Sequence, residues 1–300
     1  MVKSKVFKLG FIGAGTIGST LALKLSRQGY PVVAASSRHH TSAKRLAQLI
    51  TGCSAVTDNQ EIANRAEFVF ITTPDDVIAS AASQIAWHHG QMVVHCSGAD
   101  STDVLEPARK AGAYVGVFHP LQTFADAKAA AENMPGSTFT LEAEGALLET
   151  LKEMASALGG HWIKLAPGDK AIYHAAAVIT SNYLVTLVKM ATDLWQTFGV
   201  PREKATEALL PLIRGTVRNL ATIGLPQCLT GPIARGDSGT IRKHLEALKE
   251  AAPDMLAVYR ELGLKTIPIA LAKGGISEPQ TEELKTILAQ ANCKTAGRSL

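Results

Sequence analysis

Short apolar runs alternate with longer amphipathic stretches through the first half of the chain. The runs predict strands at Lys5–Ile12, Pro31–Ser36, Ser54–Thr57, Phe68–Thr72, Gln91–Cys96, Tyr114–Phe118, Ser137–Leu141 and Trp162–Leu165. Segments of helical length lie between most of them, at Thr16–Gln28, Ser42–Thr51, Asp75–Trp87, Asp103–Ala111 and Gly145–Leu158. Such alternation indicates crossover connections and a mostly parallel sheet. Runs such as FVFIT and MVVHC are apolar throughout, which is typical of strands covered on both faces.

The pattern changes after Pro167 and Gly168, because no strand is predicted beyond them. Lys170–Phe198 contains no Gly or Pro and predicts one helix of about 43 Å at 1.5 Å per residue. Further helices are predicted at Arg202–Ile223, Ser238–Lys249, Asp254–Leu262 or somewhat longer, and Pro279–Ala291, and residues 294–300 are expected to fray. The sequence therefore predicts an α/β domain with a doubly wound sheet over residues 1–166, and an all-α domain over residues 167–300.

Composition removes several classes of function. Of the 300 residues, 46% are hydrophobic and 19% charged, so the chain can bury a sizeable core. The formal net charge is only +4 and the basic residues are scattered, which argues against a nucleic-acid surface. The N-terminal segment lacks the features of a signal peptide, and the longest apolar stretch, near Ala175–Val188, is interrupted by polar residues. The four cysteines show no metal-binding spacing, so we expect a soluble, cytoplasmic protein without a metal or a membrane partner.

A glycine motif follows the first predicted strand and opens a helix. Its residues are Gly13, Ala14, Gly15, Thr16, Ile17 and Gly18. The first glycine suits a tight turn, the second lets the backbone approach a pyrophosphate, and the third allows close helix–strand packing. The helix N-terminus then offers free N–H groups to phosphate. The spacing and its context favour a Rossmann dinucleotide site over a glycine-rich turn without a ligand.

The end of the second strand indicates which dinucleotide binds. NAD sites place an acidic residue about 20 residues after the glycines, on the ribose 2′-hydroxyl. This chain has Ser36, Ser37 and Arg38 there, with no acid. Hydroxyls and a guanidinium suit a 2′-phosphate, which favours NADP(H) over NAD(H). The alternative is that Arg38 is an ordinary solvated loop residue.

The loops after other strands should face the nicotinamide, because the carboxyl ends of parallel strands form the binding crevice. They contribute Thr72, Thr73 and Pro74, then Cys96, Ser97 and Gly98, and then His119. Thr73 is also a candidate helix cap. Cys96 is expected to be a small buried residue rather than a nucleophile.

The long helix and one loop of the second domain supply candidate catalytic residues. Lys170 and His174 share one helix face with Ala177 and Ser181, and Asn182 lies about 80° from His174. A lysine at the helix start suits proton transfer to a substrate atom that receives a hydride. The alternative is a snorkelling Lys170 with His174 packed between domains. Arg235, in a glycine-rich loop, could bind a substrate carboxylate, and Asp237 or Ser238 could cap the next helix.

Several motifs resemble a known group of bacterial proteins. They are GAGTIG, TTPDD, HCSGA, FHPLQTF, KAIYHAAAVITSNYL and LTGPIARGD. The group has a Rossmann-like N-terminal domain and a helical C-terminal domain of unknown function. It is similar to pyrroline-5-carboxylate reductases, NADP oxidoreductases, β-hydroxyacid dehydrogenases and ketopantoate reductases. The resemblance implies a C-terminal domain like that of 6-phosphogluconate dehydrogenase, which often forms the dimer interface, so a homodimer is expected.

The resemblance also bears on individual residues. Lys170 matches the lysine of the β-hydroxyacid dehydrogenases, whereas His174 stands where those enzymes have Asn. His119-Pro120 resembles the His-Pro of prephenate dehydrogenases, which makes His119 a second acid/base candidate.

Together these observations predict an NADPH-dependent reductase of a small 2-oxo acid, with ketopantoate as the named substrate and Lys170 as proton donor. His174 or Asn182 would orient the substrate and Arg235 would hold its carboxylate. Imine reduction, oxidation of a hydroxy acid and a non-catalytic NADPH sensor remain as alternatives, because fold alone does not establish function.

Overall fold

The computed structural model describes residues 7–124, 132–166 and 168–289 and contains two compact units, Met1–Asn182 and Tyr183–Leu300. The predicted strands end before residue 166, but the division by contacts falls at Asn182, because the helix after the last strand packs on the first unit. The domain boundary at 166/167 therefore stays a prediction. Lys5 and Val6 of the first predicted strand, and residues 290–300, lie outside the described residues.

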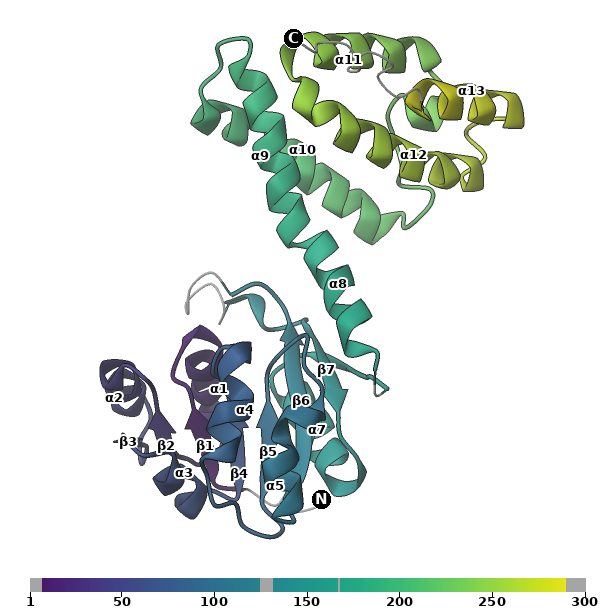
Figure 1. The fold of residues 1–300 in the computed structure, drawn as a ribbon. Coiled ribbons are helices and arrows are strands. Elements are labelled where there is room, and N and C mark those ends of the chain that lie inside the picture. The colour runs from purple at the N-terminus through teal and green to yellow at the C-terminus, as the bar shows by residue number, and fades with distance from the viewer. Residues whose placement is uncertain (1–6, 125–131, 167, 290–300) are drawn as a thin grey trace, which may run out of the picture. The chain divides into compact units, whose positions relative to one another are not determined.

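The first unit is built on an eight-stranded sheet with the order β3-β2-β1-β4-β5-β6-β7-β8 (Figure 1). The strands are β1 Leu9–Ile12, β2 Val32–Ser36, β3 Ser54–Val56, β4 Phe68–Ile71, β5 Met92–His95, β6 Tyr114–Leu121, β7 Thr138–Glu142 and β8 His161–Lys164. Neighbours are parallel except β6 and β7, where Val117 pairs with Glu142 in antiparallel register. All eight predicted strands and the mostly parallel, doubly wound sheet are confirmed.

Helices cover both faces of this sheet, as fully apolar strands require. One face packs under α1 Thr16–Arg27, α2 His40–Leu49 and α7 Gly145–Ala157, around the stacked rings of Phe11 and Phe70. The other packs under α3 Asn59–Arg65, α4 Asp75–Ser83 and α5 Glu106–Lys110, with the short η1 Thr102–Leu105 before α5. The sequence pattern missed α3, because it is only seven residues long and mostly polar, and its buried side chains are Ile62 and Ala63.

The single long helix predicted over Lys170–Phe198 is divided at Ser181 into α8 Lys170–Thr180 and α9 Asn182–Gln196. Thr180 Oγ1 donates to the backbone oxygens of Ala176 and Ala177, at 3.1 and 3.2 Å. Such side-chain bonds compete with the helical ladder and bend helices. The same kind of bond, from Thr150 Oγ1 to Ala146 O, lies inside the undivided α7, so the Thr180 bonds do not by themselves account for the division, which the apolar pattern did not show.

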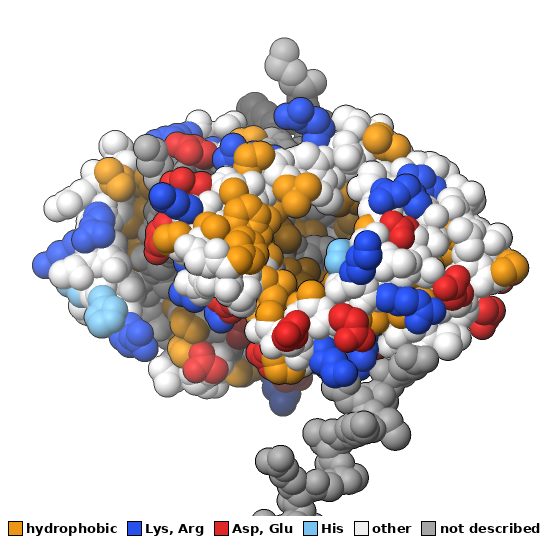
Figure 2. Space-filling view, turned by 90° about the horizontal axis from the view of Figure 1, so that it is seen from above, with side chains coloured by type: hydrophobic (Ala, Val, Ile, Leu, Met, Phe, Trp, Pro, Cys, Tyr) orange, Lys and Arg blue, Asp and Glu red, His pale blue; other side chains and the backbone are white. Residues whose placement is uncertain are grey.

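The second unit is helical, as predicted. It contains α9, α10 Arg202–Thr222, η2 Ile233–Arg235, α11 Ser238–Ala251, η3 Pro253–Met255, α12 Leu256–Ala272 and α13 Glu278–Ala289. Its core joins α11, α12 and α13 through side chains such as Ile241, Ile267 and Leu284. By contrast, α9 and α10 bury only Thr192 and Ala205. Figure 2 shows one face on which hydrophobic side chains gather near the middle of the view, with charged side chains around them.

Within the described residues, one helical stretch, Lys170–Gln196, has the length and apolar composition that a membrane span needs. A single such stretch is a weak indication, and it contains the ion pair of Lys189 with Asp193. The absence of a membrane partner and the cytoplasmic location stay predictions.

Candidate functional site

The glycine motif forms the loop between β1 and α1, with each glycine in a different role. Gly13 has φ +110°, a backbone conformation that side-chain-bearing residues rarely adopt. A Cβ on Gly18 would lie 2.1 Å from Gly13 O, so this glycine lets α1 approach the loop. A Cβ on Gly15 would meet nothing within 4 Å. The loop therefore leaves open space at the position where a pyrophosphate is expected to approach.

Thr72, the residue after β4, stabilises this loop by hydrogen bonds. Its hydroxyl donates to Gly13 O at 2.6 Å, and its backbone N–H donates to Ile12 O at 2.8 Å. Thr72 thus supports the glycine turn. Thr73 does not cap α4, since Pro74 occupies the cap position and makes no side-chain cap bond.

A pocket of about 420 Å³ lies beside the loop, at the carboxyl ends of β1 and β2. Its lining brings together Gly13, Ser36, Ser37, Arg38 and Thr73, which the sequence analysis placed near a dinucleotide. The Thr73 hydroxyl oxygen is buried and has no hydrogen-bond partner among the described residues. A ligand with donors and acceptors would satisfy it.

Two further residues of this pocket were missed by the sequence analysis. Asn59 lines it and accepts a 2.6 Å hydrogen bond from the Ser36 hydroxyl. His40, the first residue of α2, also lines it, and its buried Nδ1 has no partner in the described part of the chain. With Ser37 and Arg38, His40 adds a polar group beside a helix N-terminus, where anions are favoured. The only sequence signal was the unbroken run from Ser36 to His40.

The loop after β5 is fastened by His95, the first residue of the segment His95–Gly98 that the sequence predicts to face the nicotinamide. His95 is fully buried, its Nε2 contacts Ser101 O at 3.0 Å, and its Nδ1 accepts from the Ser97 N–H at 3.1 Å. These two bonds require a neutral ring with its hydrogen on Nε2. Burial accordingly lowers the pKa of His95 to about 4, with the Lys170 charge adding to this effect.

Ser97 and Cys96 lie in the same loop and are both buried. The Ser97 hydroxyl accepts from the N–H groups of Ala99 and Asp100, so its side chain shapes the turn. Burial raises the pKa of the Cys96 thiol to about 12, which agrees with an inert packing residue.

Lys170 begins α8 and reaches this loop. The residue is only 3% exposed, and its Nζ donates to Ser97 O at 2.7 Å. Burial lowers its pKa to about 8, while the Glu142 carboxylate acts in the opposite direction. A lysine with its pKa near neutrality is suited to exchange a proton with a substrate.

Two histidines and a tyrosine lie beside the loop that Lys170 contacts, the loop after β5. His119 Nδ1 and the Tyr173 hydroxyl are 2.8 Å apart, which links β6 to α8. A Cβ on Gly98 would lie 2.8 Å from His174 Cδ2 and 2.9 Å from His119 Nε2. Both rings therefore contact the backbone of Gly98, where any side chain would exclude them.

The protonation of His119 differs from that of Lys170. Burial lowers the pKa of His119 to about 3, and the neighbouring charges of Lys170, His174 and His95 act in the same direction. His119 is thus neutral at physiological pH, with no acidic proton to donate. Its predicted acid/base role stays a prediction.

One predicted catalytic residue of the first unit, Asn182, is not assembled with these groups. Asn182 begins α9, eight residues after His174 and roughly 12 Å further along the helix axis, and is exposed. Arg235 is exposed at the end of η2, before Gly236 with φ +68°. It belongs to the second unit, so its part in the site stays a prediction. Asp237 caps α11 by accepting from Thr240 N–H at 2.9 Å, which confirms the predicted cap.

The described residues contain no group of three or more His, Cys, Asp or Glu that could hold a metal ion.

Comparison with known proteins connects this geometry to a family. A Rossmann-like domain model matches residues 1–120, and a model described as a domain of unknown function, DUF2520, matches residues 137–266. Comparison with curated proteins gives no match.

Solved structures extend the comparison over most of the chain. A Bacteroides fragilis protein to which NADP oxidoreductase activity is attributed is 27% identical, covers 87% of this chain and 98% of its own, and has a TM-score of 0.70. Protein TM1727 of Thermotoga maritima is 23% identical, with coverage of 94% and 98% and a TM-score of 0.62. A pyrroline-5-carboxylate reductase of Coxiella burnetii is 17% identical, with coverage of 93% and 99% and a TM-score of 0.59.

These matches confirm the predicted fold and the predicted relationship to NADP oxidoreductases with a second domain of unknown function. The predicted cofactor, NADP(H), is confirmed by the similarity to the Bacteroides fragilis structure, which is named as an NADP oxidoreductase. The chain is therefore similar over residues 1–120 to Rossmann-like domains, over residues 137–266 to DUF2520 domains, and over most of its length to a solved structure named as an NADP oxidoreductase.

Proposed function

We propose that this protein is an NADPH-dependent reductase of a small 2-oxo acid, with Lys170 as the proton donor. The observation that carries the proposal is the buried ammonium of Lys170 at the carboxyl end of β5. Its Nζ donates to Ser97 O, and its pKa lies at about 8. An ionised group held there, beside the crevice where nicotinamide is expected, has a chemical use that a mere binding protein does not need.

The residues present fit the cofactor. Gly15 leaves open space for a pyrophosphate, and Ser37, Arg38 and His40 line the pocket where an adenosine 2′-phosphate would lie. The buried unpartnered atoms Thr73 Oγ1 and His40 Nδ1 provide polar contacts there. When bound, NADPH supplies the hydride, and the protein supplies orientation and the proton.

The charge of Lys170 favours a carbonyl substrate. A ketone that accepts a hydride becomes an alkoxide, and a nearby ammonium both stabilises this charge and donates the proton. Afterwards Lys170 is neutral, and its lowered pKa makes that form accessible near pH 8. His174, whose ring contacts Gly98 beside Lys170, is placed to orient the substrate oxygen.

Imine reduction is the second candidate, and the similarity to pyrroline-5-carboxylate reductase favours it. An imine accepts hydride most readily as the protonated iminium. The Lys170 ammonium could donate that proton to the imine nitrogen and become neutral in doing so. The two candidates therefore use the same proton donor and differ in the substrate that is turned over.

The 2-oxo acid needs a partner for its carboxylate, and we assign this to Arg235. A guanidinium binds a carboxylate with two parallel hydrogen bonds, and Arg235 is exposed in a turn rich in glycine.

The test is a panel of 2-oxo acids, cyclic imines and hydroxy acids, followed by NADPH oxidation or NADP reduction. Ketopantoate is the first compound, with pyrroline-5-carboxylate as the imine. Turnover of a 2-oxo acid that slows above pH 8 supports the proposal. Turnover of imines alone would replace it by imine reduction. Tight NADPH binding with no turnover on any compound would favour a sensor.

We also propose that the protein is a homodimer through α9 and α10. These two helices leave large apolar side chains exposed that a soluble monomer rarely shows together, including Val185 at 71%, Leu212 at 66% and Val217 at 54%. A second copy of the same helices would cover them, as in most soluble oligomers, which are symmetric.

A further inference from the structure

Glu142 is a buried carboxylate at the end of β7 that no step above uses. It is 7% exposed. Its Oε1 accepts two hydrogen bonds from Thr102, from the N–H at 3.2 Å and from the hydroxyl at 3.0 Å. Its Oε2 is buried and has no hydrogen-bond partner among the described residues. A buried carboxylate oxygen without a partner is costly unless a nearby positive charge compensates for it.

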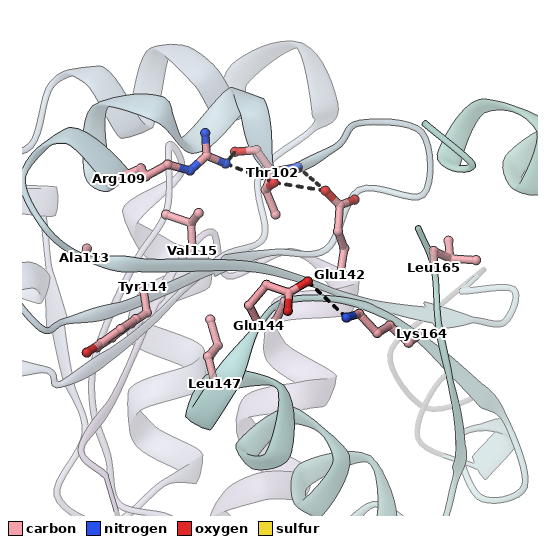
Figure 3. A pocket seen from close by; sticks show the side chains of 11 residues that line it. Thr102, Arg109, Ala113, Tyr114, Val115, Glu142, Glu144, Leu147, Lys164 and Leu165 are labelled. Carbon is pink, nitrogen blue, oxygen red and sulfur yellow. Dashed lines mark hydrogen bonds and ion pairs between the residues drawn. The ribbon is translucent and has the colours of Figure 1, made fainter. Parts of the chain in front are cut away.

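The cations closest along the surface do not provide that compensation. Glu142 lines a pocket of about 290 Å³ with Arg109 and Lys164. Figure 3 shows Arg109 directed to Thr102, and Lys164 paired with Glu144. The Arg109 guanidinium also pairs with Glu106. Each cation of the pocket therefore has another partner.

The remaining oxygen of Glu142 lies away from Arg109. In Figure 3, one carboxylate oxygen is joined to Thr102, and the other lies on the side of Leu165, the residue that follows β8 toward α8. Lys170 begins α8 and is as buried as Glu142. Of the charges that favour the ammonium form of Lys170, that of Glu142 is the largest.

Several other titratable groups interact electrostatically with Lys170. After Glu142, the groups that favour its ammonium form are Cys96, Asp75 and Asp100. The Lys170 charge in turn lowers the pKa of His95 and of His119. His174 faces His119 from α8. Cys96 is a neutral thiol at working pH, because burial raises its pKa to about 12. Asp75 begins α4, and Asp100, in the loop after β5, accepts a hydrogen bond from the Ser97 hydroxyl.

Glu142 acts on Lys170 along a second route as well. Its bonds to Thr102 fasten the end of the loop that begins at Ser97, and Ser97 O is the acceptor for Lys170 Nζ. Arg109 strengthens the same point through its bonds to Thr102 O and Oγ1. The Glu142 carboxylate, at the end of β7, thus affects both the protonation of Lys170 and the position of the loop that Lys170 binds.

We propose that Glu142 is a positioning residue, whose buried carboxylate is the counter-charge that keeps Lys170 in the ammonium form. This inference rests on the proposed function, in which Lys170 donates a proton. It assigns to the end of β7 a control over the pH range in which Lys170 carries its proton.

The test is the protonation of Lys170 itself, followed by NMR of the side-chain nitrogen in protein with ¹⁵N-labelled lysine. The Lys170 resonance is assigned from its loss in a Lys170→Arg variant. In Glu142→Gln the titration should move to lower pH by about one unit, as expected for removal of a nearby opposite charge. The matched control is Glu144→Gln, because Glu144 is two residues away and pairs with Lys164. It should leave the titration in place.

A second pair of variants separates charge from structure. Thr102→Val removes the hydroxyl that Glu142 accepts from but keeps the carboxylate, so the Lys170 titration should stay near that of the wild type. Glu142→Asp keeps the negative charge, so its Lys170 titration should lie close to that of the wild type. If Thr102→Val moves the titration as far as Glu142→Gln, or if Glu142→Gln and Glu144→Gln behave alike, the proposal is overturned.

The same variants distinguish failure of this inference from failure of the proposed function. With an active substrate, the alkaline limb of kcat should move to lower pH in Glu142→Gln along with the NMR titration. If the titration moves while no compound of the panel is turned over, the coupling of Glu142 to Lys170 stands and the reductase proposal fails. If Glu142→Gln does not fold, Glu142→Asp and Thr102→Val carry the comparison, and a titration shift in Thr102→Val without one in Glu142→Asp would contradict the role of charge.

Discussion

Lys170 Nζ donates a 2.7 Å hydrogen bond to Ser97 O, which joins the first turn of α8 to the loop after β5. The two residues lie 73 positions apart in the chain. Because the loop is itself fastened by His95, the ammonium is held against the sheet edge at which dinucleotides bind.

Replacing Lys170 tests its role in proton transfer. Lys170→Met keeps most of the volume and removes the ammonium, so kcat should fall by about 10²- to 10⁴-fold, the contribution of a positioned acid. NADPH affinity, measured by fluorescence titration, should stay within a few fold. Lys189→Met, at an exposed lysine of α9, is the matched control. A large loss of NADPH affinity in Lys170→Met would instead assign this lysine to cofactor binding.

The buried neutral histidines predict how stability depends on pH. The pKa of His95 is lowered to about 4, so between pH 6.5 and 4 the unfolded chain binds a proton that the folded chain does not. The stabilisation is complete above pH 6.5 and is lost as pH falls through this range, by about 3 kcal/mol at most. Urea unfolding of His95→Gln should show a flatter pH dependence than the wild type, whereas His161→Gln, at an exposed position of β8, should match the wild type. Equal slopes in all three proteins would contradict the prediction.

Arg38 is expected to select NADPH. In Arg38→Ala the affinity for NADPH should fall by roughly 10- to 100-fold, the value of about 1.5–3 kcal/mol for a hydrogen bond to a charged group. Affinity for NADH should change little, because NADH has no 2′-phosphate. Arg27→Ala, an exposed arginine at the end of α1, is the control for general charge. Equal weakening of both cofactors would remove the 2′-phosphate interpretation.

Substitutions at two glycines of the loop between β1 and α1 should distinguish an effect on NADPH binding from an effect on fold stability. A Cβ on Gly15 meets nothing within 4 Å, so Gly15→Ala should keep the melting temperature while weakening NADPH through contact with the ligand. A Cβ on Gly18 would clash with Gly13 O, so Gly18→Ala should destabilise the fold by about 1–3 kcal/mol. Calorimetry with and without NADPH measures both effects. A stable Gly15→Ala variant with unchanged NADPH affinity would argue against a dinucleotide at this loop.

The exposed apolar face of α9 and α10 predicts the oligomeric state. Sedimentation should show a dimer, and the pair Val185→Glu with Leu212→Glu should give monomers, because two buried carboxylates cannot be accommodated in an apolar interface. Leu49→Glu, at an exposed leucine of α2, should remain dimeric. A wild-type monomer at all concentrations would rule out this interface.

The eight strands and the order of their helices could be predicted from sequence, since each apolar run is a local signal of burial on both faces. The glycine motif could also be read directly, because its three glycines act on residues next to them. The sequence pattern did not predict the short α3 or the division at Ser181. A short polar helix has little periodicity, and no Gly or Pro marks the division at Ser181.

The sequence by itself determined the glycine loop, the basic residue after β2 and a lysine at the start of a helix, because these are local patterns of residue type. Only the tertiary structure decided what surrounds that lysine. Tyr173 meets His119 across 54 positions, and Glu142 meets Thr102 across 40. Antiparallel pairing of β7 with β6 places Glu142 beside the loop, and burial then lowers the pKa of Lys170. Solvation and charge depend on the residues that packing brings together, and no local pattern in the chain records them.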